Sequence, residues 1–199
     1  MPSIRKSLLQ FVFAGAFMKR WNDKLRPMEL LEVDKQAHKM IAAWCLYQLA
    51  CRDLPDSERI ALGRDIIEGG LFDYFYRLVI TDIKPPIFYR IKENPEHHAR
   101  LTTWVLDQLA PRLQPLGPEL WDRLEHYLAA GEKRGLAGRI LDAAHLYASQ
   151  WEFNLIKGVN PQDDEFQEIE AWFSKGLARH ADLRGVNDLA QGWSSPLGR

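Results

Sequence analysis

Three residues that could bind a divalent metal ion lie far apart in the sequence, each on a segment with helical periodicity. His38 follows Asp34 by one helical turn, and Asp142 lies beside two small alanines, three residues before His145. Asp73 is surrounded by aromatic residues, where a charge requires a partner. Imidazole and carboxylate groups are common ligands of such metals. Each residue also has a structural explanation: His38 as a core histidine bound to a carboxylate, Asp142 as a capping or solvated residue, and Asp73 as half of an ion pair.

Two further segments could handle a phosphate group. The segment KRWNDKLRP places Arg20 beside Trp21, a pair that could hold a phosphate and stack on a base. The segment TDIKPPI places Asp82 and Lys84 ahead of two prolines that fix the backbone, which would suit a catalytic loop. A basic surface strip and a solvent-facing turn are the alternative interpretations of these two segments.

The composition limits the classes of partner. The chain has 199 residues with 26 basic and 27 acidic side chains, so its formal net charge is −1. This balance argues against nucleic acid and membrane partners, which favour basic proteins. The two cysteines have no ligand-like spacing around them and are expected to be free buried thiols in a reducing cytoplasm. The apolar run over 8–18 is too short to cross a bilayer, so we expect a buried first helix.

Apolar residues recur at three- and four-residue spacing along most of the chain, which predicts helices. Alternating strand patterns are absent from the sequence. We therefore predict an all-α fold, built as a single domain over 1–199. Gly69 and Gly70 are expected to break or kink the helix that contains them. Residues 185–199 show no periodicity and are expected to form a loosely ordered tail.

In their order along the chain, these residues resemble the HD-domain metal-dependent phosphohydrolases, and within them the bacterial 5′-deoxynucleotidase branch. The resemblance extends over residues 17–160 and is carried by RW at 20–21, the turn TDIKPP and the three candidate metal ligands. It implies a single-domain HD-like helical fold. It also implies that His38, Asp73 and Asp142 hold a divalent metal ion, which could be Mn, Co, Fe, Ni, Zn or Mg.

The chain departs from this family at two positions. Phe72 stands where the family has the histidine of its His-Asp doublet, and Tyr76 stands where the family has an acid. Because a phenyl ring cannot bind a metal, the site would keep three protein ligands, and Glu68 could substitute for the fourth. The metal centre is therefore expected to be altered, weak or absent.

Two functions follow from the resemblance. The first is a metal-dependent phosphohydrolase acting on a nucleotide or similar small phosphate ester, in which the metal activates water. Arg20 would grip the phosphate and Trp21 would pack near the sugar or base. Asp82 would orient water or the leaving group, and Lys84 would screen charge.

The second function is that of a catalytically inactive HD-like protein that binds a nucleotide or a protein partner. In a third interpretation, the chain is a helical interaction protein in which the three candidate ligands form only a buried polar network. Several tryptophans on predicted helices could also support a homodimer.

Overall fold

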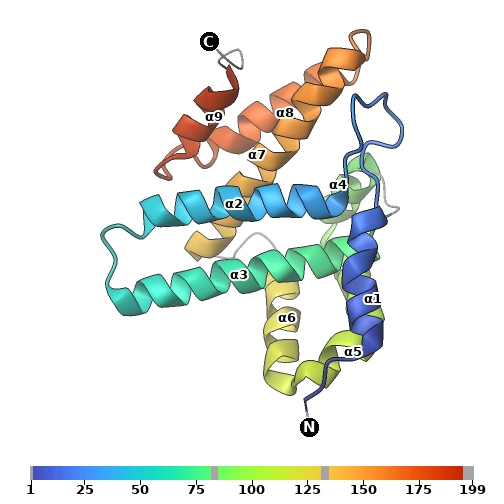
Figure 1. Cartoon of the computed structure of the whole chain (residues 1–199), viewed down its shortest axis with the longest axis vertical. Helices are drawn as coiled ribbons and strands as arrows, with labels where there is room; N and C mark the ends of the chain where they lie inside the picture. Colours follow the sequence, from blue (N-terminus) through green and yellow to red (C-terminus); the bar gives the residue numbers. More distant parts are fainter. Residues whose placement is uncertain (1, 82–84, 131–134, 195–199) are drawn as a thin grey trace. The chain divides into compact units, whose positions relative to one another are not determined.

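The computed structural model describes residues 2–81, 85–130 and 135–194. These residues are mainly helical, as Figure 1 shows. They contain no β-strand, and their one β-type pairing is an isolated antiparallel bridge between Lys19 and Leu31. The prediction of an all-α fold is therefore confirmed.

The helices of the described residues are α1 Lys6–Ala14, α2 Glu32–Ala50, α3 Asp56–Val79, α4 Pro85–Glu93, α5 Pro95–Leu113, α6 Pro118–Ala130, α7 Gly135–Val159, α8 Phe166–Ala178 and α9 Val186–Ser194. Short 3-10 turns over Gly15–Phe17 and Gln114–Leu116 follow α1 and α5. Asn94 caps α5, because its side chain accepts hydrogen bonds from the backbone N–H groups of Glu96 and His97.

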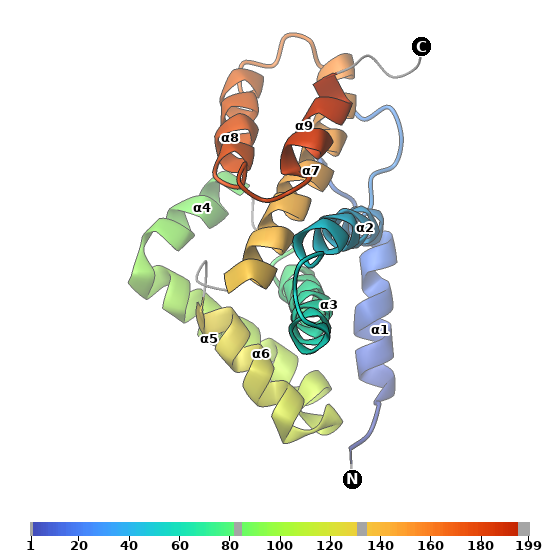
Figure 2. The same ribbon diagram turned by 90° about the vertical axis from the view of Figure 1, so that its left-hand side faces the viewer.

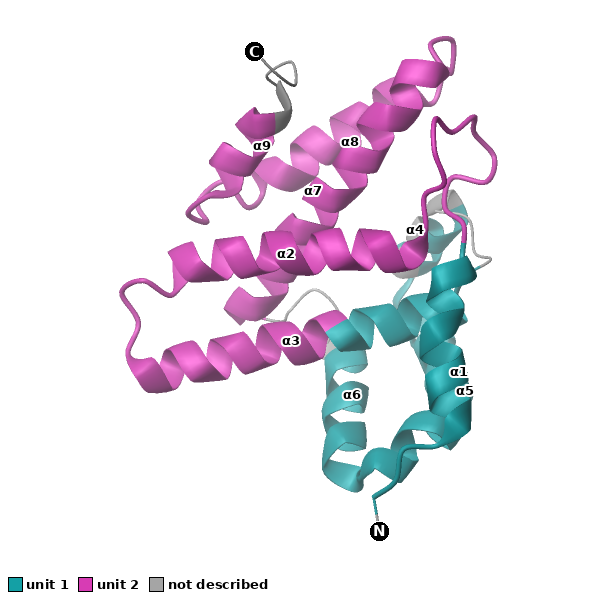
Figure 3. Ribbon diagram, viewed as in Figure 1, with its two compact units in different colours: residues 1–18, 71–134 teal, residues 19–70, 135–199 magenta. Residues whose placement is uncertain are grey.

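The chain divides into two compact units, coloured separately in Figure 3. Unit 1 comprises residues 1–18 and 71–134, and unit 2 comprises residues 19–70 and 135–199. Each unit has its own cluster of buried apolar side chains. The division at residue 70 falls inside α3, so no linker marks it in the sequence, and the sequence therefore predicts one domain.

Unit 1 is built around α5, which contacts α1, α4 and α6. Figure 2 shows α6 lying along α5. Its core combines aliphatic residues of α5 and α6 with an aromatic group from the second half of α3. Within this core the Tyr74 hydroxyl donates to the backbone oxygen of Val12 at 2.8 Å, which fixes the tyrosine ring beside α1.

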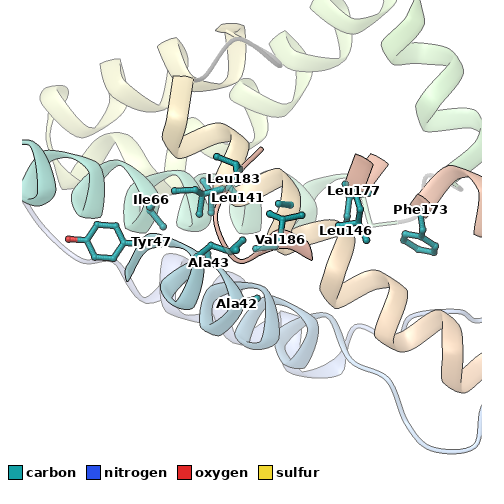
Figure 4. Packing of buried hydrophobic residues seen from close by; sticks show 14 of the residues in the cluster. Ala42, Ala43, Tyr47, Ile66, Leu141, Leu146, Phe173, Leu177, Leu183 and Val186 are labelled. Carbon is teal, nitrogen blue, oxygen red and sulfur yellow. The ribbon is translucent and has the colours of Figure 1, made fainter. Parts of the chain in front are cut away.

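Unit 2 is organised by the packing of α2 against α7, with α8 and α9 also lying against α7 (Figure 2). Alanines on both helices, among them Ala43 and Ala144, are fully buried in the core. Short side chains at these positions allow the two helices to approach closely. Figure 4 shows this core, to which Leu146, Leu177 and Val186 bring side chains from α7, α8 and the start of α9.

The prediction that Gly69 and Gly70 break their helix is wrong, because α3 continues through both glycines. A Cβ at Gly70 would overlap Sδ of Met40 on α2 and would lie 2.8 Å from its Cε. The backbone oxygen of Gly70 also accepts a hydrogen bond of 2.7 Å from Nε2 of Gln36. Gly70 therefore serves close contact between α2 and α3, which outweighs its poor helix propensity.

The prediction of a tail without regular structure does not hold for residues 186–194, which form α9. Val186 is buried in the core of unit 2, and Leu189 and Ala190 pack against that core. Their three- and four-residue spacing is a helical pattern that is too short to stand out among the surrounding glycines and serines. Residues 195–199 lie outside the described part of the chain.

Two expectations about burial hold only in part. Cys45 and Cys51 are both free thiols, but Cys45 is exposed and Cys51 alone is buried. In α1 Leu8 is buried, whereas Leu9 and Phe13 are exposed. No helix among the described residues has the length and apolar character that crossing a membrane requires.

The contact between Gly15 and Tyr74 gives a test of the core of unit 1. A Cβ at the buried Gly15 would overlap the Tyr74 hydroxyl and would lie 2.8 Å from Cζ of the rigid ring. We expect Gly15→Ala to lower the free energy of unfolding by about 1–3 kcal/mol, the usual cost of overpacking. Chemical denaturation monitored by circular dichroism measures this loss.

Gly158→Ala is the matched control, because Gly158 lies in α7 with open space around its Cα. Alanine should stabilise the protein there by about 0.4–1 kcal/mol, since it reduces the entropy of the unfolded chain. If Gly15→Ala were as stable as Gly158→Ala, the Tyr74 ring could not lie where the structure places it.

Candidate functional site

Arg20 lies in the loop before α2 and is bound by two buried carboxylates. Its Nε donates to both carboxylate oxygens of Glu152 on α7, at 3.0 and 2.8 Å, and its Nη1 donates to Glu32 on α2 at 2.6 Å. The three side chains are 13, 2 and 3% exposed, respectively. Burial alone would lower the pKa of Arg20, but the charges of Glu32 and Glu152 outweigh burial and raise it. The guanidinium is therefore a fixed internal cation.

Trp21 also contacts the ion cluster that Arg20, Glu32 and Glu152 form. Its Nε1 donates to Oε2 of Glu152 at 2.9 Å, and its ring packs near Phe153, with 6.3 Å between the ring centroids. Among the described residues other than glycine, Trp21 alone has a positive φ, at 56°. The antiparallel bridge between Lys19 and Leu31 closes the loop that holds this backbone conformation. Trp21 therefore orients a buried carboxylate, and its packing near a sugar or base stays a prediction.

Two lysines of α2 extend the cluster into the core. Lys35 is 4% exposed, and its Nζ lies 2.7 Å from Nδ1 of His145 on α7. Burial, followed by the nearby positive charge of Arg20, holds the pKa of Lys35 well below its usual range. Lys39, one helical turn later, is 2% exposed. The interior of unit 2 therefore contains several ionisable groups supplied by the chain itself.

These buried charges were missed at the sequence level, although a signal for them exists. Glu32, Lys35 and Lys39 share one helix face with Ala42 and Leu46, both of which are buried. Charged residues at three- and four-residue spacing on the apolar face of a helix must be paired when that face is buried. This pattern on α2 could have indicated an internal ion cluster.

His38 lies on the exposed side of α2. Its ring meets Trp151 of α7 in an edge-to-face arrangement, with 5.0 Å between centroids. The interpretation of His38 as a core histidine is therefore wrong. Asp34, also exposed, lies one turn earlier on the same helix.

Asp142 is half-buried on α7. Its charge acts on His180, a buried residue that follows α8. Burial lowers the pKa of His180, and the negative charge of Asp142 opposes this shift. Nδ1 of His180 has no hydrogen-bond partner among the residues described. Asp142 therefore lies within electrostatic range of His180.

Asp73 accepts a hydrogen bond from the hydroxyl of Tyr127 on α6, at 3.0 Å. The adjacent Phe72 is buried, and its ring packs edge-to-face on Tyr127 with 5.4 Å between centroids. Both side chains of the Phe72-Asp73 pair thus interact with one tyrosine in the core of unit 1. This contact explains how a carboxylate is tolerated among aromatic residues.

Tyr76 and Glu68 are the other two residues of α3 connected with the predicted site, and the Tyr76 hydroxyl is buried without a hydrogen-bond partner among the described residues. The Tyr76 ring lies near Phe88, and burial raises the pKa of its hydroxyl to about 12. Glu68 forms an ion pair with Arg64 one turn earlier, with 3.6 Å between Oε1 and Nε. Neither contact indicates a metal.

The residues predicted to bind a metal belong to different units. His38, Glu68 and Asp142 are in unit 2, whereas Asp73 is in unit 1. Within the described ranges, no three His, Cys, Asp or Glu side chains are grouped as a metal ion would require. The metal centre therefore stays a prediction from the resemblance.

The two residues predicted to act in catalysis, Asp82 and Lys84, lie outside the described residues. Their roles in orienting water and screening charge stay predictions.

A cavity of about 320 Å³ in unit 2 lies beside the ion cluster. This volume falls at the lower end of the range for small-molecule sites. The residues that line the cavity come from the loop before α2, from the exposed side of α2 and from α7: Met28, Glu29, Leu30, Leu31, Asp34, Ala37, His38, Trp151 and Glu152. Of the predicted site residues that the structure describes, His38 alone is in this lining.

Comparisons of the chain with models of protein families, with curated proteins and with solved structures find no match. The relation to the HD-domain phosphohydrolases therefore remains a resemblance in sequence.

The buried Lys35 predicts a specific dependence of stability on pH. Because the folded-state pKa of Lys35 is lowered, the unfolded chain binds the extra proton at every pH between that lowered value and about 10.4, the ordinary lysine pKa. The lysine therefore contributes a rise in the free energy of unfolding with increasing pH across this window. We expect Lys35→Met to lack that rise in urea denaturation measured at a series of pH values.

Lys175→Met is the control, because Lys175 is exposed on α8 and should keep the wild-type pH dependence. Equal pH slopes for wild type and Lys35→Met would contradict the burial of an ionisable amine at this position.

Proposed function

We propose that this chain binds a small organic molecule in the cavity of unit 2 and does not hydrolyse a phosphate ester. The observation that carries the proposal is the engagement of Arg20 by Glu152 and Glu32. At its Nε and Nη1, this arginine could bind a phosphate only by giving up a carboxylate that it already binds. Removing one partner of a buried ion pair costs about 3–5 kcal/mol. A charged hydrogen bond between the arginine and the phosphate contributes about 1.5–3 kcal/mol, so exchanging a carboxylate for a phosphate is unfavourable.

The walls of the cavity support binding, because they are fixed before any ligand arrives. Glu152 is held by Arg20 and Trp21, and the rings of His38 and Trp151 support each other. Both ring residues lie on long helices, α2 and α7. Preformed walls on rigid elements lower the entropy that a ligand must lose on binding.

A metal-dependent phosphohydrolase is the competing proposal, and the order of residues along the sequence supports it. It requires Asp73 as a ligand and a fourth ligand to replace Phe72. In unit 1, however, Tyr127 binds the Asp73 carboxylate and packs on the Phe72 ring. These contacts favour a structural role for the Phe72-Asp73 pair.

The variant Phe72→His tests the two proposals against each other. Truncation of a buried phenylalanine to alanine costs about 3–5 kcal/mol, and an imidazole refills part of the lost volume. We therefore expect a lower melting temperature that Mn²⁺ or Co²⁺ does not restore, and no phosphate release from nucleoside monophosphates. Metal analysis, thermal melts with and without metal, and a phosphate assay measure these outcomes.

Wild-type protein purified without chelator is the control and should contain no stoichiometric divalent metal. A metal-dependent rise in the melting temperature of Phe72→His, together with phosphate release, would favour the phosphohydrolase, because a ligand that binds only the folded state stabilises it.

Binding in the cavity is tested by filling it. Ala37 lies on the cavity lining and on the exposed side of α2, so Ala37→Phe should block the site without disturbing the core. We expect at least one member of a probe set to bind the wild type saturably in isothermal titration calorimetry. The set contains 2-phenylethanol, phenethylamine and phenylacetate. Ala37→Phe should weaken that binding at least about tenfold, which corresponds to about 1.4 kcal/mol.

Ala61→Phe is the matched control, since Ala61 is an exposed alanine on α3 of the same unit and is not part of the lining. The proposal is wrong if no probe binds, or if binding is the same in Ala37→Phe and wild type.

A further inference from the structure

The side chains around the cavity carry an excess of negative charge. Three carboxylates line it, from Glu29, Asp34 and Glu152, and no Lys or Arg is among the described residues of the lining. Arg20 neutralises the charge of Glu152 from inside the protein. Lys19 pairs with Glu29, with 3.3 Å between Nζ and Oε2. The pair formed by Lys19 is more than half exposed on both sides, so solvent screens most of its effect.

Asp34 differs from the other two carboxylates. It is exposed, and the described part of the chain gives it neither an ion-pair partner nor a hydrogen-bond donor. The neighbouring Lys35 does not neutralise it from within the cavity, because Lys35 is buried with its Nζ at His145. A carboxylate at the edge of a cavity therefore has a free charge.

The rest of the lining is apolar or aromatic. Met28, Leu30, Leu31 and Ala37 supply aliphatic surface, and Trp151 supplies an indole beside the His38 ring. An indole ring attracts cations more strongly than other aromatic side chains do. The volume of about 320 Å³ corresponds to about ten non-hydrogen atoms, since one water molecule occupies about 30 Å³.

We infer that the ligand of this cavity is an organic cation of about this size, an amine attached to a compact apolar or aromatic body. Its ammonium group would lie toward Asp34, and its apolar part would contact Trp151 and the aliphatic wall. This inference rests on the proposed function, which it deepens by giving the chemical class of the ligand. A phosphorylated ligand is disfavoured at the same cavity, because its charge has the sign of the lining carboxylates.

A series of probes with one carbon skeleton and different charge tests the inference on the wild-type protein. Phenethylamine is a cation, 2-phenylethanol is its neutral counterpart and phenylacetate is an anion. We expect phenethylamine to bind at least about tenfold more tightly than 2-phenylethanol in isothermal titration calorimetry, and phenylacetate to bind most weakly. Higher salt concentration should reduce this preference.

The variant Asp34→Asn tests whether the Asp34 carboxylate is the charge that attracts the cation. It keeps the shape of the side chain, and Asp34 is exposed, so the fold should be retained, which a thermal melt verifies. We expect the preference for phenethylamine over 2-phenylethanol to fall about tenfold in Asp34→Asn, the change that loss of a single charged contact produces. Asp65→Asn, at an exposed aspartate on α3 of the same unit, should keep the wild-type preference.

The outcomes separate this inference from the function on which it rests. If 2-phenylethanol or phenylacetate binds as tightly as phenethylamine, and Ala37→Phe removes that binding, the cavity binds ligands but the cation assignment is wrong. If Asp34→Asn keeps the full preference, the role of Asp34 is wrong. If Ala37→Phe leaves the binding of every probe unchanged, the proposed function fails and the inference fails with it.

Discussion

The ion cluster of Arg20, Glu32 and Glu152 is the constraint on which the rest of unit 2 depends. It joins the loop before α2, the first turn of α2 and the middle of α7 through contacts of 2.6–3.0 Å. Loss of Arg20 would remove the cation that binds both buried carboxylates, at a cost of about 3–5 kcal/mol. That cost is a large part of the stability of an ordinary domain, about 5–15 kcal/mol. The position of the loop, and with it one wall of the cavity, is therefore fixed by electrostatics as much as by apolar packing.

The same cluster gives the interior of unit 2 cations that belong to the chain. A metal site places an ion next to an imidazole nitrogen, whereas here the Lys35 nitrogen lies 2.7 Å from Nδ1 of His145. Unlike a metal ion, the lysine nitrogen is covalently part of the chain. It can also lose its proton when burial makes the charged form unfavourable. Unit 2 thus places a lysine nitrogen of the chain itself beside the imidazole of α7.

Sequence patterns predicted the elements that depend on residues close together in the sequence. They failed where contacts between residues far apart in the sequence decide the structure. Apolar spacing predicted helices along most of the chain, and α2, α3 and α7 are long helices of this kind. The continuity of α3 through Gly70 was missed because Met40, which requires a residue without a side chain there, belongs to another helix. Arg20 was assigned to a phosphate because Glu152, its partner, lies 132 positions away. No spacing rule connects residues at that separation, although the charged face of α2 showed that some partner was needed.

The binding partners of the Arg20 guanidinium decide which ligand charge the cavity favours. Had the guanidinium faced the cavity, it would have outweighed one carboxylate and favoured an anion such as a phosphate. Because Glu152 and Glu32 bind the Nε and Nη1 donors of Arg20 inside the protein, Asp34 remains as the charge at the cavity edge that the described part of the chain leaves unmatched. One set of buried contacts thus fixes the wall of the cavity. The same contacts change the favoured charge of the ligand from negative to positive. The pairing of two distant side chains, rather than the presence of the Arg-Trp motif, is what distinguishes a cation site from a phosphate site in this chain.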